Sequence, residues 1–80
     1  MSRLPVLTWR QVTLALERAG FVFDRQRGSH MVYYHPETNR TVIVPRHKGI
    51  KLGTLREIMR EADLTRDDFR KLLEKQGGLE

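Results

Sequence analysis

The spacing of hydrophobic residues near the start of the chain predicts an amphipathic helix. Apolar side chains recur there at intervals of three and four residues: Trp9, Val12, Leu16 and Ala19. Such spacing places them on a single buried stripe of a helix. Thr8 and Gln11 have the spacing of a capping box, and Gly20 is a typical helix stop. We therefore expect a helix over about residues 8–19.

Three segments rich in β-branched and aromatic residues follow the predicted helix, and residues typical of turns separate them. These predicted strands cover about residues 21–26, 30–35 and 40–44. Gly28 and Ser29 belong to the first turn, and residues 36–39 form the second. Because short turns join neighbouring antiparallel strands, the pattern predicts a three-stranded antiparallel meander.

The last third of the chain is predicted to be helical, over about residues 54–62 and 65–75. Thr54 and Glu57 repeat the capping-box spacing, and Thr65 is the expected N-cap of the final helix. A chain of 80 residues is too short for two domains, so residues 1–80 should form one α+β domain of the order α-β-β-β-α-α. Helices that bury their apolar stripes on one sheet face leave the other face available for binding.

The positive charge of the chain is concentrated in its middle. The formal net charge is +5, and residues 25–51 hold six Lys and Arg residues against one acidic residue, Glu37. The nine basic and nine acidic residues elsewhere balance each other. A local basic field favours a polyanionic partner, with nucleic acid as the first candidate. The alternative is a solvated basic surface that serves solubility alone.

Cysteine content and hydropathy bear on the compartment. The sequence contains no cysteine, so no disulfide can stabilise the fold. No apolar stretch is long enough to predict a membrane-spanning helix. Residues 1–7 contain Pro5 and only a brief apolar run, unlike a signal peptide. We expect a soluble cytoplasmic protein that does not associate with membranes.

His30 is the main candidate for acid–base chemistry. It stands at the first position of the middle predicted strand, directly after Gly28 and Ser29. A strand end is held by the sheet yet open to solvent, which suits a general acid or base, and imidazole titrates near neutral pH. Gly28 permits the close approach of a ligand, and the Ser29 hydroxyl can donate to a phosphate oxygen. The alternative is an ordinary surface histidine or a core histidine with satisfied hydrogen bonds.

The arrangement of the histidines argues against a metal site. Side chains alternate along a strand. One set therefore comprises His30, Val32 and Tyr34, and the opposite set comprises Met31, Tyr33 and His35. His47 falls in a separate loop, and no cysteine or carboxylate cluster lies nearby, so no set of metal ligands is predicted. Ser29 also lacks a recognisable third partner for nucleophilic catalysis.

Five segments of the chain occur in an order and spacing that match a known family. They are Arg25 to His30, Tyr34 to Pro36, Val42 to Gly49, Gly53 to Ile58 and Leu64 to Phe69. Over about residues 9–73 this ordered set resembles the HicA toxins, also called YcfA-like proteins. The resemblance implies a fold like the double-stranded RNA-binding domain, mRNA interferase activity in a type II toxin–antitoxin system, and a cognate HicB antitoxin that buries the active site. The family's catalytic histidine lies in its Gly-Ser-His motif, which matches His30 here.

The activity implied by the resemblance is that of a metal-independent endoribonuclease that needs no cofactor. RNA carries its own nucleophile, the 2′-hydroxyl, so a base and stabilising cations can suffice. His30 would transfer the proton, and Tyr33 or Tyr34 would stack on an unpaired base if its ring faces outward. The helix start expected at Thr54 would add an anion site. The residues expected to bind the RNA are Arg25, Arg27, Gly28, Ser29, Arg46, Lys48 and Lys51.

Two positions depart from the family pattern. Asp63 stands where the family often has a glycine after the second helix, and Met31 stands where a second histidine or polar residue is common. Neither departure affects the role expected of His30. Two other functions are consistent with the sequence: a domain that binds RNA without cutting it, and an interaction module whose basic face docks an acidic protein.

Overall fold

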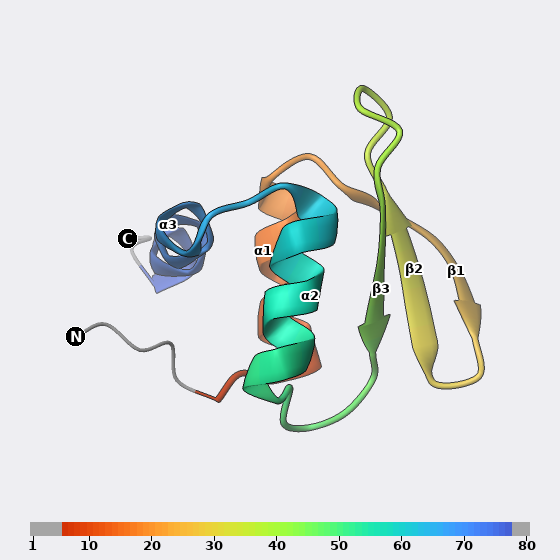
Figure 1. The fold of residues 1–80 in the computed structure, drawn as a ribbon, viewed down its shortest axis with the longest axis horizontal. Coiled ribbons are helices and arrows are strands. Elements are labelled where there is room, and N and C mark those ends of the chain that lie inside the picture. The colour runs from red at the N-terminus through yellow and green to blue at the C-terminus, as the bar shows by residue number, and fades with distance from the viewer. Residues whose placement is uncertain (1–5, 78–80) are drawn as a thin grey trace.

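The computed structural model describes residues 6–77, with the backbone alone in residues 75–77. Within this range the elements follow the predicted order α-β-β-β-α-α. They are α1 (Trp9–Arg18), β1 (Val22–Arg27), β2 (His30–Tyr34), β3 (Thr41–Pro45), α2 (Leu52–Ala62) and α3 (Arg66–Gly77) (Figure 1). Residues 1–5 and 78–80 of the predicted single domain lie outside the described residues. No helix in the described part of the chain is long and apolar enough to cross a membrane.

The predicted capping box opens α1. The Thr8 hydroxyl accepts a hydrogen bond from the Gln11 N–H at 3.2 Å, and the Gln11 side-chain oxygen accepts one from the Thr8 N–H at 2.9 Å. Gly20 lies two residues beyond the last helical residue, and its φ is +104°. A Cβ atom there would come within 2.6 Å of Nε2 of His35. The turn out of α1 therefore requires glycine both for its backbone angle and for space.

The three strands form one antiparallel sheet in the order β1-β2-β3. Gly28 has a φ of +60° at the first position of the two-residue turn between β1 and β2, the pattern of a type II′ hairpin turn. Met31 pairs with Val44 and Tyr33 pairs with Val42, and all four are buried on the inner face. The outer face presents the alternate residues, which include Arg25, Arg27, His30, Val32, Thr41 and Ile43.

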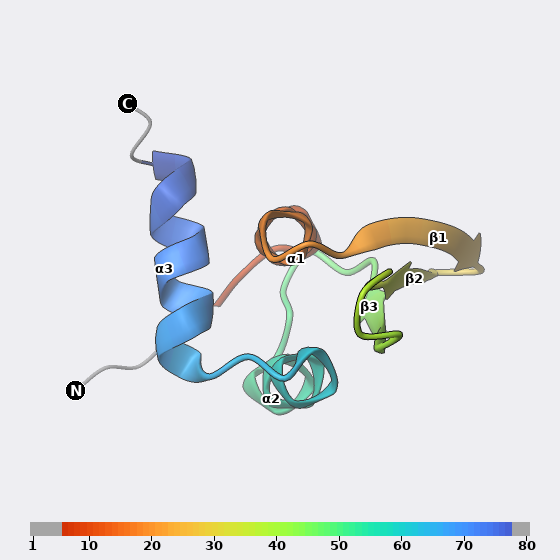
Figure 2. The ribbon, with the colours of Figure 1, turned by 90° about the horizontal axis from the view of Figure 1, so that it is seen from above.

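All three helices lie on one side of the sheet, as predicted, but in two layers (Figure 2). α1 and α2 pack against β3, whereas α3 packs chiefly on α1 and buries Phe69 completely. Three strands about 4.8 Å apart make a sheet roughly 10 Å wide, and two helices of about 10 Å diameter are enough to cover it. The third helix consequently buries its apolar stripe against another helix instead of the sheet.

The predicted capping box at the start of α2 is wrong. The helix begins at Leu52, two residues before Thr54, and its N-cap is Lys51, whose side chain makes no capping hydrogen bond. Ile50 is buried, and its N–H donates to the Leu7 carbonyl at 2.7 Å, so a contact with the N-terminal segment fixes the chain just before the helix. The Leu55 N–H then donates to the Lys51 carbonyl at 2.9 Å and closes the first turn.

A tight connection joins α2 to α3. Asp63 takes a left-handed conformation, with φ of +61° and ψ of +41°, in the position where glycine is the preferred residue. The Thr65 N–H donates to the Asp68 carboxylate at 3.0 Å, and the Asp68 N–H donates to the Thr65 hydroxyl at 3.0 Å. This reciprocal pair confirms Thr65 as the residue that caps the final helix.

Candidate active site

His30 begins β2 and is exposed to solvent on the outer face of the sheet. It pairs with Arg27 of β1 on one side and with Pro45 of β3 on the other, so both neighbouring strands fix its backbone. Its imidazole makes no hydrogen bond with any group in residues 6–77. Both ring nitrogens are therefore available to a ligand, as a general acid or base requires.

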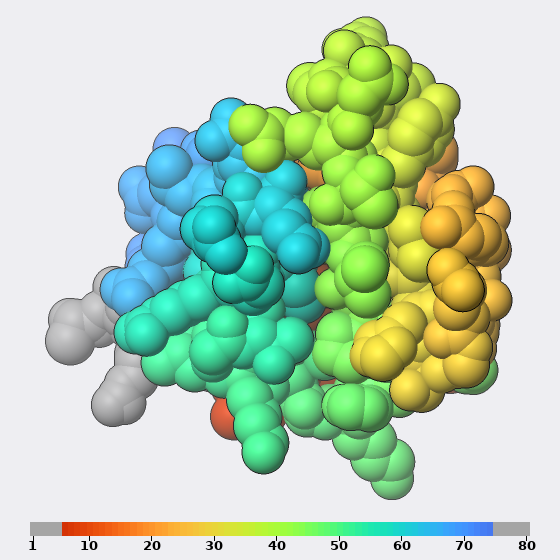
Figure 3. Space-filling view, turned by 45° about the vertical axis from the view of Figure 1, so that its right-hand side comes forward, coloured from red at the N-terminus to blue at the C-terminus, as the bar shows by residue number. Residues whose placement is uncertain are grey.

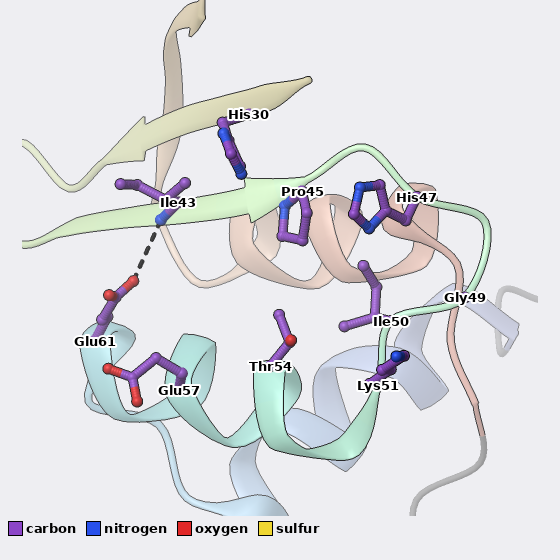
Figure 4. A pocket seen from close by; sticks show the side chains of 10 residues that line it. All are labelled: His30, Ile43, Pro45, His47, Gly49, Ile50, Lys51, Thr54, Glu57 and Glu61. Carbon is purple, nitrogen blue, oxygen red and sulfur yellow. Dashed lines mark hydrogen bonds between the residues drawn. The ribbon is translucent and has the colours of Figure 1, made fainter. Parts of the chain in front are cut away.

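Two hollows meet at His30. The first, called the β3–α2 groove here, has a volume of about 520 Å³ and runs between β3 and one side of α2 (Figure 3). The residues that line it are His30, Ile43, Pro45, His47, Gly49, Ile50, Lys51, Thr54, Glu57 and Glu61 (Figure 4). The second, called the sheet-face hollow, has a volume of about 390 Å³. Its lining comprises Arg25, Arg27, His30, Val32, Thr41 and Ile43.

The sheet-face hollow combines a cationic rim with an apolar floor. Arg25 pairs with Val32 and Arg27 pairs with His30 across the β1–β2 ladder, which places both arginines on the side of the sheet that carries the imidazole. Arg25 also forms an exposed salt bridge with Asp24. Val32 is only 5% exposed although it lies on the outer face, because the hollow is bordered by longer side chains. Such a surface suits a phosphate backbone with an unstacked base.

The acidic residues of the β3–α2 groove already have partners. The Glu61 carboxylate accepts a hydrogen bond from the Ile43 N–H at 3.3 Å, on the free edge of β3. The Glu57 carboxylate pairs with Arg60 of the same helix. Lys51, by contrast, forms no ion pair within residues 6–77. The end of the groove near Lys51 and the first turn of α2 is therefore its electropositive end.

The structure does not bring every predicted binding residue to these two hollows. The guanidinium of Arg46 lies over the Trp9 ring, 5.0 Å from its centroid, and Arg10 lies 4.7 Å from the same centroid. Lys48 is exposed but lines neither hollow. The Gly28-Ser29 turn lies next to His30, and a Cβ atom at Gly28 would meet nothing within 4 Å, so this bend is open to a ligand.

Sequence reasoning missed His47, which lines the β3–α2 groove together with His30. The Arg46 N–H donates to the Ser29 carbonyl at 2.7 Å, and the His47 N–H donates to the Pro45 carbonyl at 2.8 Å. These hydrogen bonds hold the loop after β3 close to the start of β2, so that His47 lines the groove. The register could have indicated this, because Pro45 is the cross-strand partner of His30 and stands two residues before His47.

His35 has a structural role in the fold, and both of its ring nitrogens are occupied by hydrogen bonds. Its Nδ1 accepts a hydrogen bond from the Glu37 N–H at 3.2 Å, so Nε2 carries the proton and donates to the Ala19 carbonyl at 3.2 Å. Its ring also meets Phe21 edge to face, with centroids 5.0 Å apart. Within residues 6–77 no group of three or more His, Cys, Asp or Glu side chains is placed to hold a metal ion.

The fold and the site together define a class of protein: a small basic α+β domain with the topology of a double-stranded-RNA-binding domain. Its open sheet face carries an unpaired histidine at the edge of a groove. The family model of the HicA toxins of bacterial toxin–antitoxin systems matches residues 9–64, and the chain belongs to this family. Membership implies a toxin that has a cognate antitoxin. The comparison with curated proteins gives no match.

Proposed function

We propose that this HicA-family toxin is a metal-independent endoribonuclease, an mRNA interferase of the cytoplasm, and that His30 transfers a proton in the reaction. The observation that carries the proposal is the state of the His30 ring, which is exposed and free of hydrogen bonds to residues 6–77 at the junction of a groove and a cationic hollow. His35, which directly follows β2, instead has both ring nitrogens in hydrogen bonds. The position of His30 is thus suited to exchange a proton with a substrate, whereas that of His35 is not.

The chemistry needs few protein groups, because RNA supplies its own nucleophile. A base that removes the proton of a 2′-hydroxyl allows that oxygen to attack the adjacent phosphorus. Cations that lie beside the phosphate stabilise the negative charge that develops on the phosphorane. Arg25 and Arg27 border His30 on one side and Lys51 lies across the groove on the other, so one phosphate near the imidazole is within a positive field.

The substrate in this proposal is single-stranded mRNA. Val32 and Ile43 form the floor of the sheet-face hollow, and Tyr34 is 38% exposed, so an unstacked base has apolar surface to cover. Tyr33 is not available for stacking, because it is buried and its ring packs against Phe23 with centroids 5.6 Å apart. Gly28, Ser29, Arg46 and Lys48 extend the binding surface along the backbone of the RNA on either side of the scissile phosphate.

The cognate antitoxin of this toxin, in our proposal, is a HicB-type protein that covers His30. The exposed apolar residues of the outer sheet face support this, because Ile43 beside His30 is 45% exposed and Val22, farther along the same face, is 44% exposed. An antitoxin with acidic and apolar groups would bury this surface and exclude RNA from it.

The test is cleavage of end-labelled single-stranded RNA in the presence of EDTA. Wild-type protein should produce fragments, and His30→Ala should reduce the cleavage rate by about 10²- to 10⁴-fold, because a positioned proton-transfer group contributes about that factor. The ring of His30 makes no hydrogen bond with residues 6–77, so the thermal unfolding midpoint of His30→Ala should be close to that of wild type.

Each alternative function has its own outcome in this experiment. Equal cleavage by wild type and His30→Ala would disprove the role of His30. Binding of RNA without cleavage by the wild type would make the chain a non-catalytic RNA-binding domain. Neither binding nor cleavage, with a stable antitoxin complex, would make it a protein-interaction module.

A further inference from the structure

The β3–α2 groove contains two imidazoles, and the proposed role of His30 accounts for one of them. His30 enters from the start of β2 and His47 enters from the loop after β3, with Pro45 between them (Figure 4). Both residues are exposed. Like the His30 ring, the His47 ring makes no hydrogen bond with any group in residues 6–77. Free imidazoles from two separate segments thus converge on one hollow.

Cleavage of RNA by its own 2′-hydroxyl requires two proton transfers. The 2′-oxygen must lose a proton as it bonds to phosphorus, and the 5′-oxygen must gain a proton as its bond to phosphorus breaks. An alkoxide leaves poorly unless it is protonated, so a group that donates to the 5′-oxygen accelerates the reaction as much as a base does. Since the two oxygens lie on opposite sides of the phosphorus in an in-line reaction, two separate protein groups serve them best.

The other polar groups of the groove are less suited to the second transfer. Carboxyl groups are ordinarily ionised at neutral pH and hold no proton to donate. The Glu61 carboxylate also bonds to the edge of β3, and the Glu57 carboxylate pairs with Arg60. A lysine ammonium group stabilises negative charge, but it is a weaker proton donor than an imidazolium. An imidazole can hold or release a proton in this range.

The loop that carries His47 is held firmly on both sides. Before it, the Arg46 N–H bonds to the Ser29 carbonyl at 2.7 Å, and the Arg46 guanidinium lies over the Trp9 ring at 5.0 Å. After it, Ile50 is buried and its N–H bonds to the Leu7 carbonyl at 2.7 Å. A group that is preorganised in this way loses little entropy when it engages a substrate.

We propose that His47 is a second catalytic residue, which performs the proton transfer that His30 does not; this inference rests on the proposed ribonuclease function. One imidazole accepts the 2′-hydroxyl proton while the bond between the 2′-oxygen and phosphorus forms. The other, as imidazolium, donates a proton to the 5′-oxygen while the bond between phosphorus and the 5′-oxygen breaks. The products are a 2′,3′-cyclic phosphate and a free 5′-hydroxyl. The histidines end in exchanged protonation states, and water restores them.

The experiment compares His30→Gln and His47→Gln on two substrates. One is an ordinary RNA oligonucleotide with a mapped cleavage site, and the other carries sulfur in place of the bridging 5′-oxygen at that site. A thiol has a pKa of about 8.5, so a thiolate leaves without help from an acid. Lys71→Gln on α3 is the control, because α3 lies on the far side of α1 and α2 from the sheet (Figure 2).

On ordinary RNA both histidine variants should be slower than wild type by about 10²- to 10⁴-fold, and the control should match wild type. On the sulfur-containing RNA one histidine variant should recover to within about tenfold of wild type, and the other should stay slow. The variant that recovers identifies the proton donor. Unfolding midpoints of all variants establish that the fold is intact.

Three results would overturn the assignment of His47. The first is that His47→Gln cleaves ordinary RNA at the wild-type rate while His30→Gln is inactive. This result would leave the role of His30 intact. The second is an unchanged loss of activity in both variants on the sulfur substrate, which would make His47 a binding or positioning residue. The third is recovery of both variants, which would leave no base among the two histidines. Inactive wild-type protein would instead refute the proposed function itself.

Discussion

The contact between Gly20 and His35 ties the end of α1 to the end of β2. The ring of His35 lies with Nε2 at 3.2 Å from the Ala19 carbonyl and leaves no room for a side chain at position 20. The backbone of Gly20 also has a φ of +104°, which residues with a side chain rarely adopt. Two independent costs, one steric and one conformational, therefore apply to any substitution of this glycine.

Gly20→Ala should lower the free energy of unfolding by roughly 1–3 kcal/mol, because the new methyl group meets the His35 ring and the backbone is strained. Urea unfolding monitored by circular dichroism measures the change. Gly53→Ala is the matched control, since a Cβ atom there meets nothing within 4 Å and alanine in a helix is favoured by up to about 1 kcal/mol. An unfolding midpoint of Gly20→Ala equal to that of wild type would contradict this explanation.

Residue patterns predicted which side chains share a face of the sheet but not which face is buried. The prediction that His30 and His35 face opposite sides is confirmed, since the His35 ring contacts Ala19 and Phe21 on the helix side. Both alternating sets are partly apolar, so periodicity alone did not determine which face is buried. The structure settles this, and it also buries Val32 on the outer face beneath neighbouring side chains.

At the scale of elements, local sequence signals predicted the starts of α1 and α3 correctly but not the start of α2. The caps of α1 and α3 are hydrogen bonds between residues three apart, so a short stretch of sequence contains all the information. The start of α2 depends on the pairing of Ile50 with Leu7, a contact between segments more than 40 residues apart. No local pattern predicts such a contact, so no sequence signal indicated that the helix begins two residues before Thr54.

The cap of α3 makes stability depend on pH in the acid range. Hydrogen bonds from Thr65 lower the pKa of the Asp68 carboxyl below its ordinary value. A carboxyl group with a lowered pKa in the folded state stabilises the protein above its unfolded-state pKa of about 3.9, and this contribution is lost as the pH falls through the folded-state value. Asp68→Asn should therefore be less stable than wild type at pH 7, and the difference should shrink below about pH 4.

Urea unfolding of Asp68→Asn and wild type at several pH values measures this dependence. Asp67→Asn removes the same charge from the first turn of α3, but Asp67 does not form the reciprocal cap with Thr65. Its effect on stability should vary less with pH. A stability difference for Asp68→Asn that stays constant from pH 7 to about pH 3 would exclude the proposed ionic contribution.

At the scale of the whole molecule, the β3–α2 groove brings together the start of β2, the end of β3 with the loop that follows it, and one side of α2. Composition located the basic region between residues 25 and 51, and the order of elements predicted an open sheet face. Neither contains the relative placement of α2 and β3, which depends on how the helices pack. The groove could therefore not be derived before the fold was known, although the correct pairing of His30 with Pro45 would have placed His47 near His30.

If the position of positive charge governs RNA binding, two variants with the same net charge should differ in salt dependence. Lys51 lines the groove across from His30, whereas Lys71 lies on α3, beyond the α1–α2 layer. In a His30→Ala background, which prevents cleavage, Lys51→Gln should reduce the slope of log K against log salt concentration by about 0.7, the value for one contact with a single-stranded phosphate. Lys71→Gln should leave the slope unchanged. Fluorescence anisotropy titrations of a labelled oligonucleotide at several salt concentrations measure both slopes, and an equal change in the two variants would mean that only the total charge matters.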